Sequence, residues 1–113
     1  MKLVEKPLTK FEILEIKKTY GSYIKITADI ETGILLAGCA LHTDGEAVLL
    51  QKGSKQDAIW GGGLHFELKE IDTTAVLNLR PRLKNNSLEI LDPARRDKFI
   101  KIVENIFQNL WET

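Results

Sequence analysis

The residues best suited to chemistry in this sequence are anion-binding types, and they gather between positions 78 and 87. Asn78 and Arg80 alternate with leucines, so a strand there would place both polar side chains on one face. The planar guanidinium of arginine binds carboxylate and phosphate groups through two hydrogen bonds, and amides and hydroxyls complete such sites. We therefore predict an anion-binding site formed by Asn78, Arg80, Asn86 and Ser87. The alternative is a solvated sheet surface with ordinary ion pairs.

His42 and Asp44 form a second titratable pair. Histidine is the usual base at neutral pH and the commonest metal ligand. The string "HTD" lacks the paired histidine or cysteine spacing of metal sites, so we predict no metal site. No spacing in the chain indicates a particular reaction, and no motif identifies a cofactor. The catalytic activity and the cofactor therefore stay unknown.

Three consecutive glycines, Gly61 to Gly63, directly follow Trp60. A phosphate-binding Walker loop needs a lysine directly after its second glycine, and a dinucleotide fingerprint leads into a helix. The glycines meet neither condition. We predict a backbone bend that starts a strand at Leu64, and a mobile flap that carries Trp60 over a pocket is the alternative.

The elements that must position these residues begin with a helix over 10–19, which Thr9 and Glu12 start as a capping box. Strict alternation then predicts a half-buried strand over 24–30. A turn at Gly33 leads to the apolar run 34–41, which suits a central strand paired as a hairpin. Segment 43–52 fits either a short helix, begun by a capping box of Thr43 and Glu46, or a hairpin strand, and we favour the helix.

The second half of the chain predicts strands over 64–69 and 75–80, a loop over 82–87 and a last helix. Asp92 caps that helix, Pro93 takes its first position, and it runs to about Leu110. The predicted fold is α+β, in one domain over 1–113. It is a small antiparallel sheet of about four to five strands, with the N-terminal helix and a long amphipathic C-terminal helix packed mainly on one face.

The apolar arc of the last helix is wide for packing against a single sheet. It fits a deeply seated core helix, or an additional homodimer contact through Ile100, Phe107 and Trp111. The formal net charge of zero makes nucleic acid an unlikely partner, although "RPRLK" and "ARRDK" are locally basic. The start resembles no signal peptide, no apolar run reaches membrane length, and Cys39 is the one cysteine, so we expect a cytoplasmic protein without membrane contact.

The strings "LHTDGEA", "GSKQDAIWG", "AVLNLRP" and "DPARRDKFIKIV" occur in that order. In this arrangement the chain resembles a group of small prokaryotic proteins catalogued only as a domain of unknown function. The resemblance runs from the first helix to the last. It implies an α+β fold and a cytoplasmic location, and it implies no activity, ligand or catalytic residue.

Two functional hypotheses remain. The first is a small cytoplasmic interaction or ligand-binding module that is homo-oligomeric. The second is an enzyme-like anion-binding domain, in which Asn78, Arg80, Asn86 and Ser87 hold the ligand, His42 and Asp44 titrate, and Trp60 covers the pocket.

Overall fold

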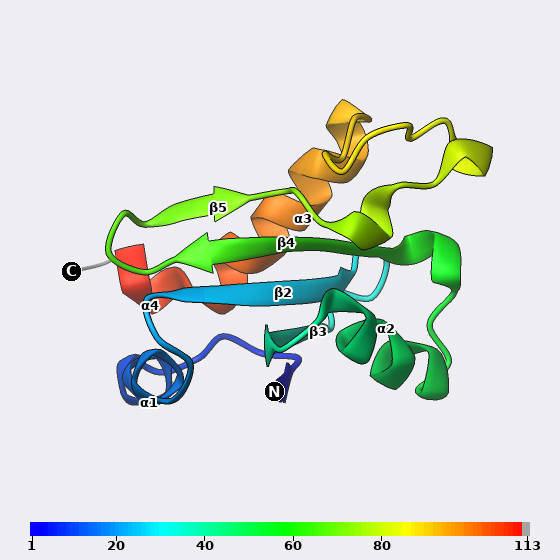
Figure 1. Ribbon diagram of the computed structural model, residues 1–113. Coiled ribbons are helices and arrows are strands. Elements are labelled where there is room, and N and C mark those ends of the chain that lie inside the picture. The colour runs from blue at the N-terminus through cyan, green and yellow to red at the C-terminus, as the bar shows by residue number, and fades with distance from the viewer. Residues whose placement is uncertain (112–113) are drawn as a thin grey trace.

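The computed structural model describes residues 1–111, and its centre is a five-stranded antiparallel sheet in the order β1-β3-β2-β4-β5 (Figure 1). The strands are β1 (Lys2–Val4), β2 (Tyr23–Asp29), β3 (Leu35–Cys39), β4 (Ile59–His65) and β5 (Glu70–Asp72). The helices are α1 (Lys10–Tyr20), α2 (His42–Gln51), α3 (Pro93–Ile106) and α4 (Gln108–Trp111). Short 3₁₀ turns are η1 (Gln56–Ala58), η2 (Val76–Asn78) and η3 (Pro81–Leu83). The α+β prediction is confirmed. Within residues 1–111 there is no helix with the length and apolar character needed to cross a membrane.

The sheet separates two apolar clusters. The larger one joins the sheet to α1, α3 and the start of α4, and its largest members include Ile26, Trp60, Phe99 and Phe107. Figure 1 shows α3 crossing behind the central strands. The smaller cluster holds α2 against the opposite face through Leu36, Cys39, Leu49 and Ile59. The N- and C-terminal helices thus share one face as predicted, and α2 covers the other.

Local capping signals place the two terminal helices. The Thr9 hydroxyl accepts the Glu12 N–H at 3.1 Å, and the Glu12 carboxylate accepts the Thr9 N–H at 3.0 Å. The Asp92 carboxylate accepts the Arg95 N–H at 2.9 Å. The first helix therefore agrees with its prediction to within one residue. The last helix is interrupted at Phe107, where the chain leaves α3 and resumes as α4.

Segment 43–52 is a helix, as we favoured, but it begins earlier than predicted. Its N-cap is Leu41, and the Asp44 carboxylate accepts the Leu41 N–H at 3.2 Å. The predicted capping box of Thr43 and Glu46 is therefore wrong, because Glu46 is drawn instead into an ion pair with Arg80.

The strand predictions over 75–80 and 24–30 need correction. Residues 76–78 form the turn η2, which buries Asn78 and leaves Val76 76% exposed. The alternation there was misleading because the polar residues face inward. Strand β2 is covered on both faces over its second half, where Thr27 and Asp29 are buried beneath α2 and the turns around it.

Candidate functional site

The three glycines lie in the middle of β4. Gly61, Gly62 and Gly63 pair with Thr27, Ile26 and Lys25 of the central strand β2. The strand therefore starts at Ile59 rather than Leu64, and the predictions of a bend or a mobile flap are wrong. Backbone pairing along β2 outweighs the low strand propensity of glycine.

Each glycine makes room for a ring from another element. A Cβ on Gly61 would lie 2.9 Å from the His42 ring, and one on Gly63 would collide with the phenol of Tyr23. On the opposite face, a Cβ on Gly62 would lie 2.7 Å from the ring of Phe99. The His42 and Tyr23 rings can therefore approach the backbone of β4 closely on the α2 face of the sheet, because Gly61 and Gly63 have no side chains there.

A row of polar residues crosses the sheet at Gly63. Lys25 of β2 pairs with Gly63, and Gly63 pairs with Asp72 of β5, so all three share the α2 face. The Tyr23 hydroxyl reaches over Gly63 and donates to the Asp72 carboxylate at 2.9 Å. His65, opposite Tyr23 in the register, packs against the phenol ring with the centroids 4.4 Å apart. We call the group Tyr23, Lys25, His42, His65 and Asp72 the glycine-strip site.

His42 is held in one tautomer at this site. Its Nε2 lies 2.7 Å from the Gly62 carbonyl oxygen, and because a carbonyl only accepts, Nε2 carries the proton. Burial lowers the pKa of His42, the bond to Gly62 opposes that shift, and the positive charge of Lys25 lowers the pKa further. The imidazole is therefore neutral at neutral pH.

Tyr23 is held in its protonated form. Burial raises the pKa of the phenol, and its hydrogen bond to the Asp72 carboxylate raises it further. The second Asp72 oxygen accepts the Thr74 N–H at 3.2 Å. Asp72 therefore orients the Tyr23 hydroxyl as a hydrogen-bond donor.

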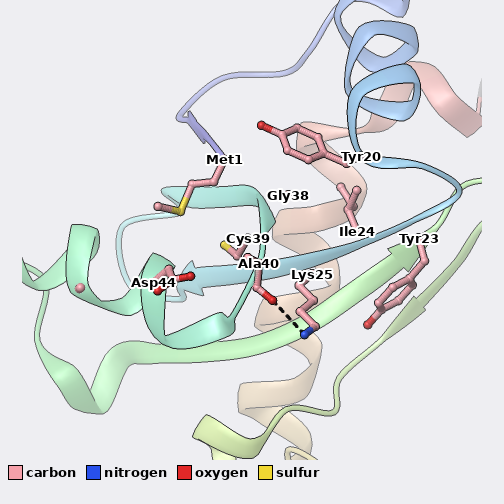
Figure 2. A pocket seen from close by; sticks show the side chains of 10 residues that line it. Met1, Tyr20, Tyr23, Ile24, Lys25, Gly38, Cys39, Ala40 and Asp44 are labelled. Carbon is pink, nitrogen blue, oxygen red and sulfur yellow. Dashed lines mark hydrogen bonds between the residues drawn. The ribbon is translucent and has the colours of Figure 1, made fainter.

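An open groove of about 750 Å³ adjoins the site and shares Tyr23 and Lys25 with it. Figure 2 shows Tyr20, Tyr23, Lys25 and Asp44 around this groove, with the Lys25 ammonium donating to the Ala40 carbonyl at 3.1 Å. The complete lining is Met1, Tyr20, Tyr23, Ile24, Lys25, Gly38, Cys39, Ala40, Asp44 and Ala47. The groove thus combines apolar and aromatic walls with the Lys25 ammonium and the Asp44 carboxylate.

Cys39 lines the groove as a buried thiol. Burial raises its pKa, and the sulfur contacts the Thr27 hydroxyl at 3.9 Å and the Leu36 carbonyl at 3.6 Å. A thiol that is neutral in this way is a poor nucleophile. Its role in the groove is that of a small apolar surface.

Asn78 lies at the end of the molecule where α2 meets η2, and its amide is fully engaged. Its oxygen accepts the Gly61 N–H at 2.9 Å, and its nitrogen donates to the carbonyls of Gly61, Thr73 and Leu88. The neighbouring Asn85 amide makes a similar set of bonds to backbone groups. Asn78 thus holds the segment 73–91 against β4, and Asn85 joins backbone groups within that segment.

Arg80 and Trp60 lie together at the same end. The Arg80 guanidinium donates to the Ile59 carbonyl at 2.6 Å and to the Glu46 carboxylate at 3.1 Å, and its side chain is 8% exposed. It also stacks over the fully buried Trp60 ring, 4.9 Å from the ring centroid, and Arg95 does so at 5.1 Å. The structure therefore places Trp60 in the core. Arg80, which lies between η2 and η3, connects these turns to α2 and β4.

The remaining predicted residues lie apart from these contacts. Asn86 is exposed, and the Ser87 hydroxyl accepts the Glu89 N–H at 3.1 Å within its own loop. Asp44 lies at the groove and caps α2. Asp44 thus lines the groove, His42 lies on β4 at Gly61 and Gly62, and Asn86 and Ser87 belong to the loop over 84–87.

The basic residues at the start of α3 have intramolecular partners. Arg95 covers Trp60, and Arg96 donates to the Ile90 carbonyl at 3.1 Å. Arg82 pairs with Asp57. These contacts account for cations near a helix N-terminus, where the helix dipole disfavours them.

Sequence reasoning missed Tyr23, Lys25 and Asp72. Two signals could have found them together. The polar face of β2 begins with Tyr23 and Lys25, and a glycine-rich strand beside it would leave those side chains space to converge. The described residues contain no group of three or more His, Cys, Asp or Glu side chains that could hold a metal ion.

The fold and this site define a small α+β protein with a groove between α1, α2 and the central strands, in which apolar walls surround a few charged groups. The chain belongs to the family described as "Protein of unknown function (DUF5674)", whose family model matches residues 2–106. No curated protein and no solved structure matches the chain.

Proposed function

We propose that this protein is a ligand-binding module for a small organic acid, which binds in the groove with its acid group at Lys25. The observation that carries the proposal is the position of Lys25. Its ammonium lines a groove of about 750 Å³ and donates to one backbone carbonyl, so two of its three N–H donors remain for a ligand.

The other walls support a ligand with an apolar body. Tyr20, Ile24 and Cys39 offer aromatic and aliphatic surface, and pockets of this size with a few polar groups are typical of small-molecule sites. Asp44 on the α2 side disfavours a second acid group. The Tyr23 hydroxyl is committed to Asp72 and holds the edge of the groove in place.

The anion site first predicted at Arg80 is the weaker candidate. Its guanidinium is paired with Glu46 and the Ile59 carbonyl, and Asn78 has no free hydrogen-bonding group. A ligand at Arg80 would have to displace a buried ion pair, which costs several kcal/mol. We propose a cytoplasmic location, which the free thiol of Cys39 supports because free thiols persist in reducing compartments.

The test combines native mass spectrometry of the untagged protein with a carboxylate panel. Mass lost on denaturation would reveal a carried ligand. Acetate, propanoate, benzoate and phenylacetate are then screened for a rise in melting temperature, since a ligand that binds only the folded state stabilises it. We expect Lys25→Met to abolish the rise and the exposed control Lys98→Met to preserve it. Equal responses of the two variants would refute the assignment.

A second candidate function is self-association, now proposed through α1 and α4. Phe107 is fully buried in the core, so of the three residues first considered only Ile100 and Trp111 retain exposed surface. On α1, Phe11 is 69% and Leu14 61% exposed, and Leu14 borders a small apolar groove with Ile13 and Leu110. Exposed apolar surface of this kind marks interaction sites.

Sedimentation velocity tests this contact with a matched pair of variants. Leu14→Glu should convert a dimer to monomer, whereas Leu68→Glu, 66% exposed but in the turn after β4, should leave the sedimentation coefficient unchanged. A wild-type protein that sediments as a monomer at high concentration would rule out the contact.

A further inference from the structure

We propose that His42 is the residue that selects the ligand, so that the site prefers an organic acid with a hydroxyl or amino donor next to its acid group. This inference rests on the proposed function and adds a ligand class to it. The reasoning starts from the atom of the imidazole that the fold leaves open.

One imidazole nitrogen donates a hydrogen bond, and the other has no hydrogen-bond partner among residues 1–111. The Nε2–H donates to the Gly62 carbonyl, so Nδ1 carries the lone pair and acts as an acceptor. No group of residues 1–111 donates to Nδ1, and His42 is half-buried. The ring cannot turn freely, because Nε2 is bonded to Gly62 and the ring packs so closely against Gly61 that an added methyl group would touch it.

The open acceptor lies on the same face of the sheet as the lysine. The Thr27 hydroxyl, two positions along β2 from Lys25, donates to the His42 carbonyl at 2.8 Å. The His42 ring packs against Gly61, two positions along β4 from the Gly63 that pairs with Lys25. The Lys25 ammonium donates to the Ala40 carbonyl, two positions before His42. The positive charge of Lys25 also acts on the imidazole. A cation with free donors next to a neutral acceptor complements a ligand that has an anionic group and an adjacent donor.

Burial is the main cause that lowers the pKa of His42 and keeps Nδ1 an acceptor, and two nearby charges modify this effect. Lys25 faces the imidazole from β2 and disfavours protonation, while Asp72 faces it from β5 and partly opposes that effect. Asp44 lies on the same helix turn, and one of its carboxylate oxygens accepts the Leu41 N–H. His42 thus differs from an exposed histidine, which would offer a second cation at mildly acidic pH.

The test uses pairs of acids that differ by one hydroxyl: lactate against propanoate, and mandelate against phenylacetate. Binding is measured by NMR titration of the wild-type protein at pH 7.5. We expect each hydroxy acid to bind about two- to tenfold more tightly than its partner, the range of one net hydrogen bond. His42→Phe, which keeps a flat ring on Gly61, should remove this preference, and Lys25→Met should weaken both members of a pair.

A second measurement needs no variant. The protonation of His42 is followed by its imidazole NMR signals as pH falls. Protonation turns Nδ1 into a donor, which a hydroxyl group can accept but an ammonium group cannot. The preference for alanine, which carries an ammonium group next to its acid group, over propanoate should therefore disappear as His42 gains its second proton.

The outcomes separate this inference from the proposed function. Equal binding of both acids, or a preference that survives in His42→Phe and at low pH, overturns the role of His42 and leaves the Lys25 site intact. If neither acid of either pair binds the wild-type protein, the proposed function fails and this inference fails with it.

Discussion

At the scale of single residues, two buried asparagines decide the path of the chain after β5. The Asn78 amide replaces the backbone partners that a strand would have supplied, and Asn85 donates to the Asn78 carbonyl at 2.7 Å. The backbone groups of this segment are satisfied by side chains, so the segment can be irregular and still packed. This explains why Val76 and Leu79 point outward while Asn78 is buried.

We predict that Asn78→Ala lowers the free energy of unfolding by about 2–4 kcal/mol, because several buried backbone groups lose their partners at once. Asn86→Ala, an exposed position in the neighbouring loop, should change it by less than about 0.5 kcal/mol. Urea unfolding of the two variants measures both values. Similar losses in the two variants would contradict the role given to Asn78.

Residue-scale features differ in how far they can be predicted. The caps of α1 and α3 were predictable because Thr9 with Glu12, and Asp92 with Arg95, interact over three positions. The partners of Asn78 lie at Gly61, Thr73 and Leu88, up to 17 positions away. No local pattern reports such contacts, so the polar residues of 75–80 were misplaced on a strand.

At the scale of elements, β4 shows why its three glycines led to a wrong prediction of a bend or flap. Isolated glycines weaken strands, so three in succession indicate a break. In this protein β4 lies between β2 and β5, and rings from β2, α2 and α3 fill the space that its side chains would take. Strand and site thus depend on the same missing Cβ atoms, and both could be recognised only with the neighbouring strands in place.

We predict that Gly63→Ala costs about 1–3 kcal/mol of unfolding free energy, because the added methyl group collides with the Tyr23 phenol in a packed sheet. Introducing the same change into a Tyr23→Ala background should cost clearly less, since the colliding ring is absent. Guanidinium unfolding of the four proteins gives the coupling energy. Additive losses would show that Tyr23 does not occupy the space above Gly63.

At the scale of the whole molecule, Asp29 at the end of β2 joins the sheet to two loops. One is the turn over 31–32, and the other is the loop that contains Ser54. Burial pushes the pKa of Asp29 upward, but hydrogen bonds from Ser54, Thr32 and Glu31 outweigh it and leave the pKa below its ordinary value of 3.8. A lowered pKa in the folded state stabilises the protein above the unfolded pKa. That stability is lost as pH falls below about 4 toward the folded value.

We predict that Asp29→Asn is less stable than the wild type by about 1–3 kcal/mol at pH 7, because the amide cannot accept bonds at both positions. The difference should shrink as pH falls below about 4, where the wild-type carboxylate also becomes protonated. Thermal unfolding across pH 3–7 measures it, with the exposed neighbour Glu31→Gln as control. A difference that stays constant down to pH 3 would contradict this account.

The contacts between the two ends of the described chain have a consequence for biosynthesis. The Leu8 N–H donates to the Ile106 carbonyl at 2.8 Å, and the Asn109 amide donates to the Leu8 carbonyl at 2.6 Å. A nascent chain whose synthesis has reached residue 100 contains the residues of every strand, yet Leu8 still lacks both partners. Closing this contact requires a loop of about a hundred residues, which is slow on entropic grounds. We therefore expect the apolar sheet face that α3 covers to be completed late, and an apolar face exposed at that stage is prone to aggregation.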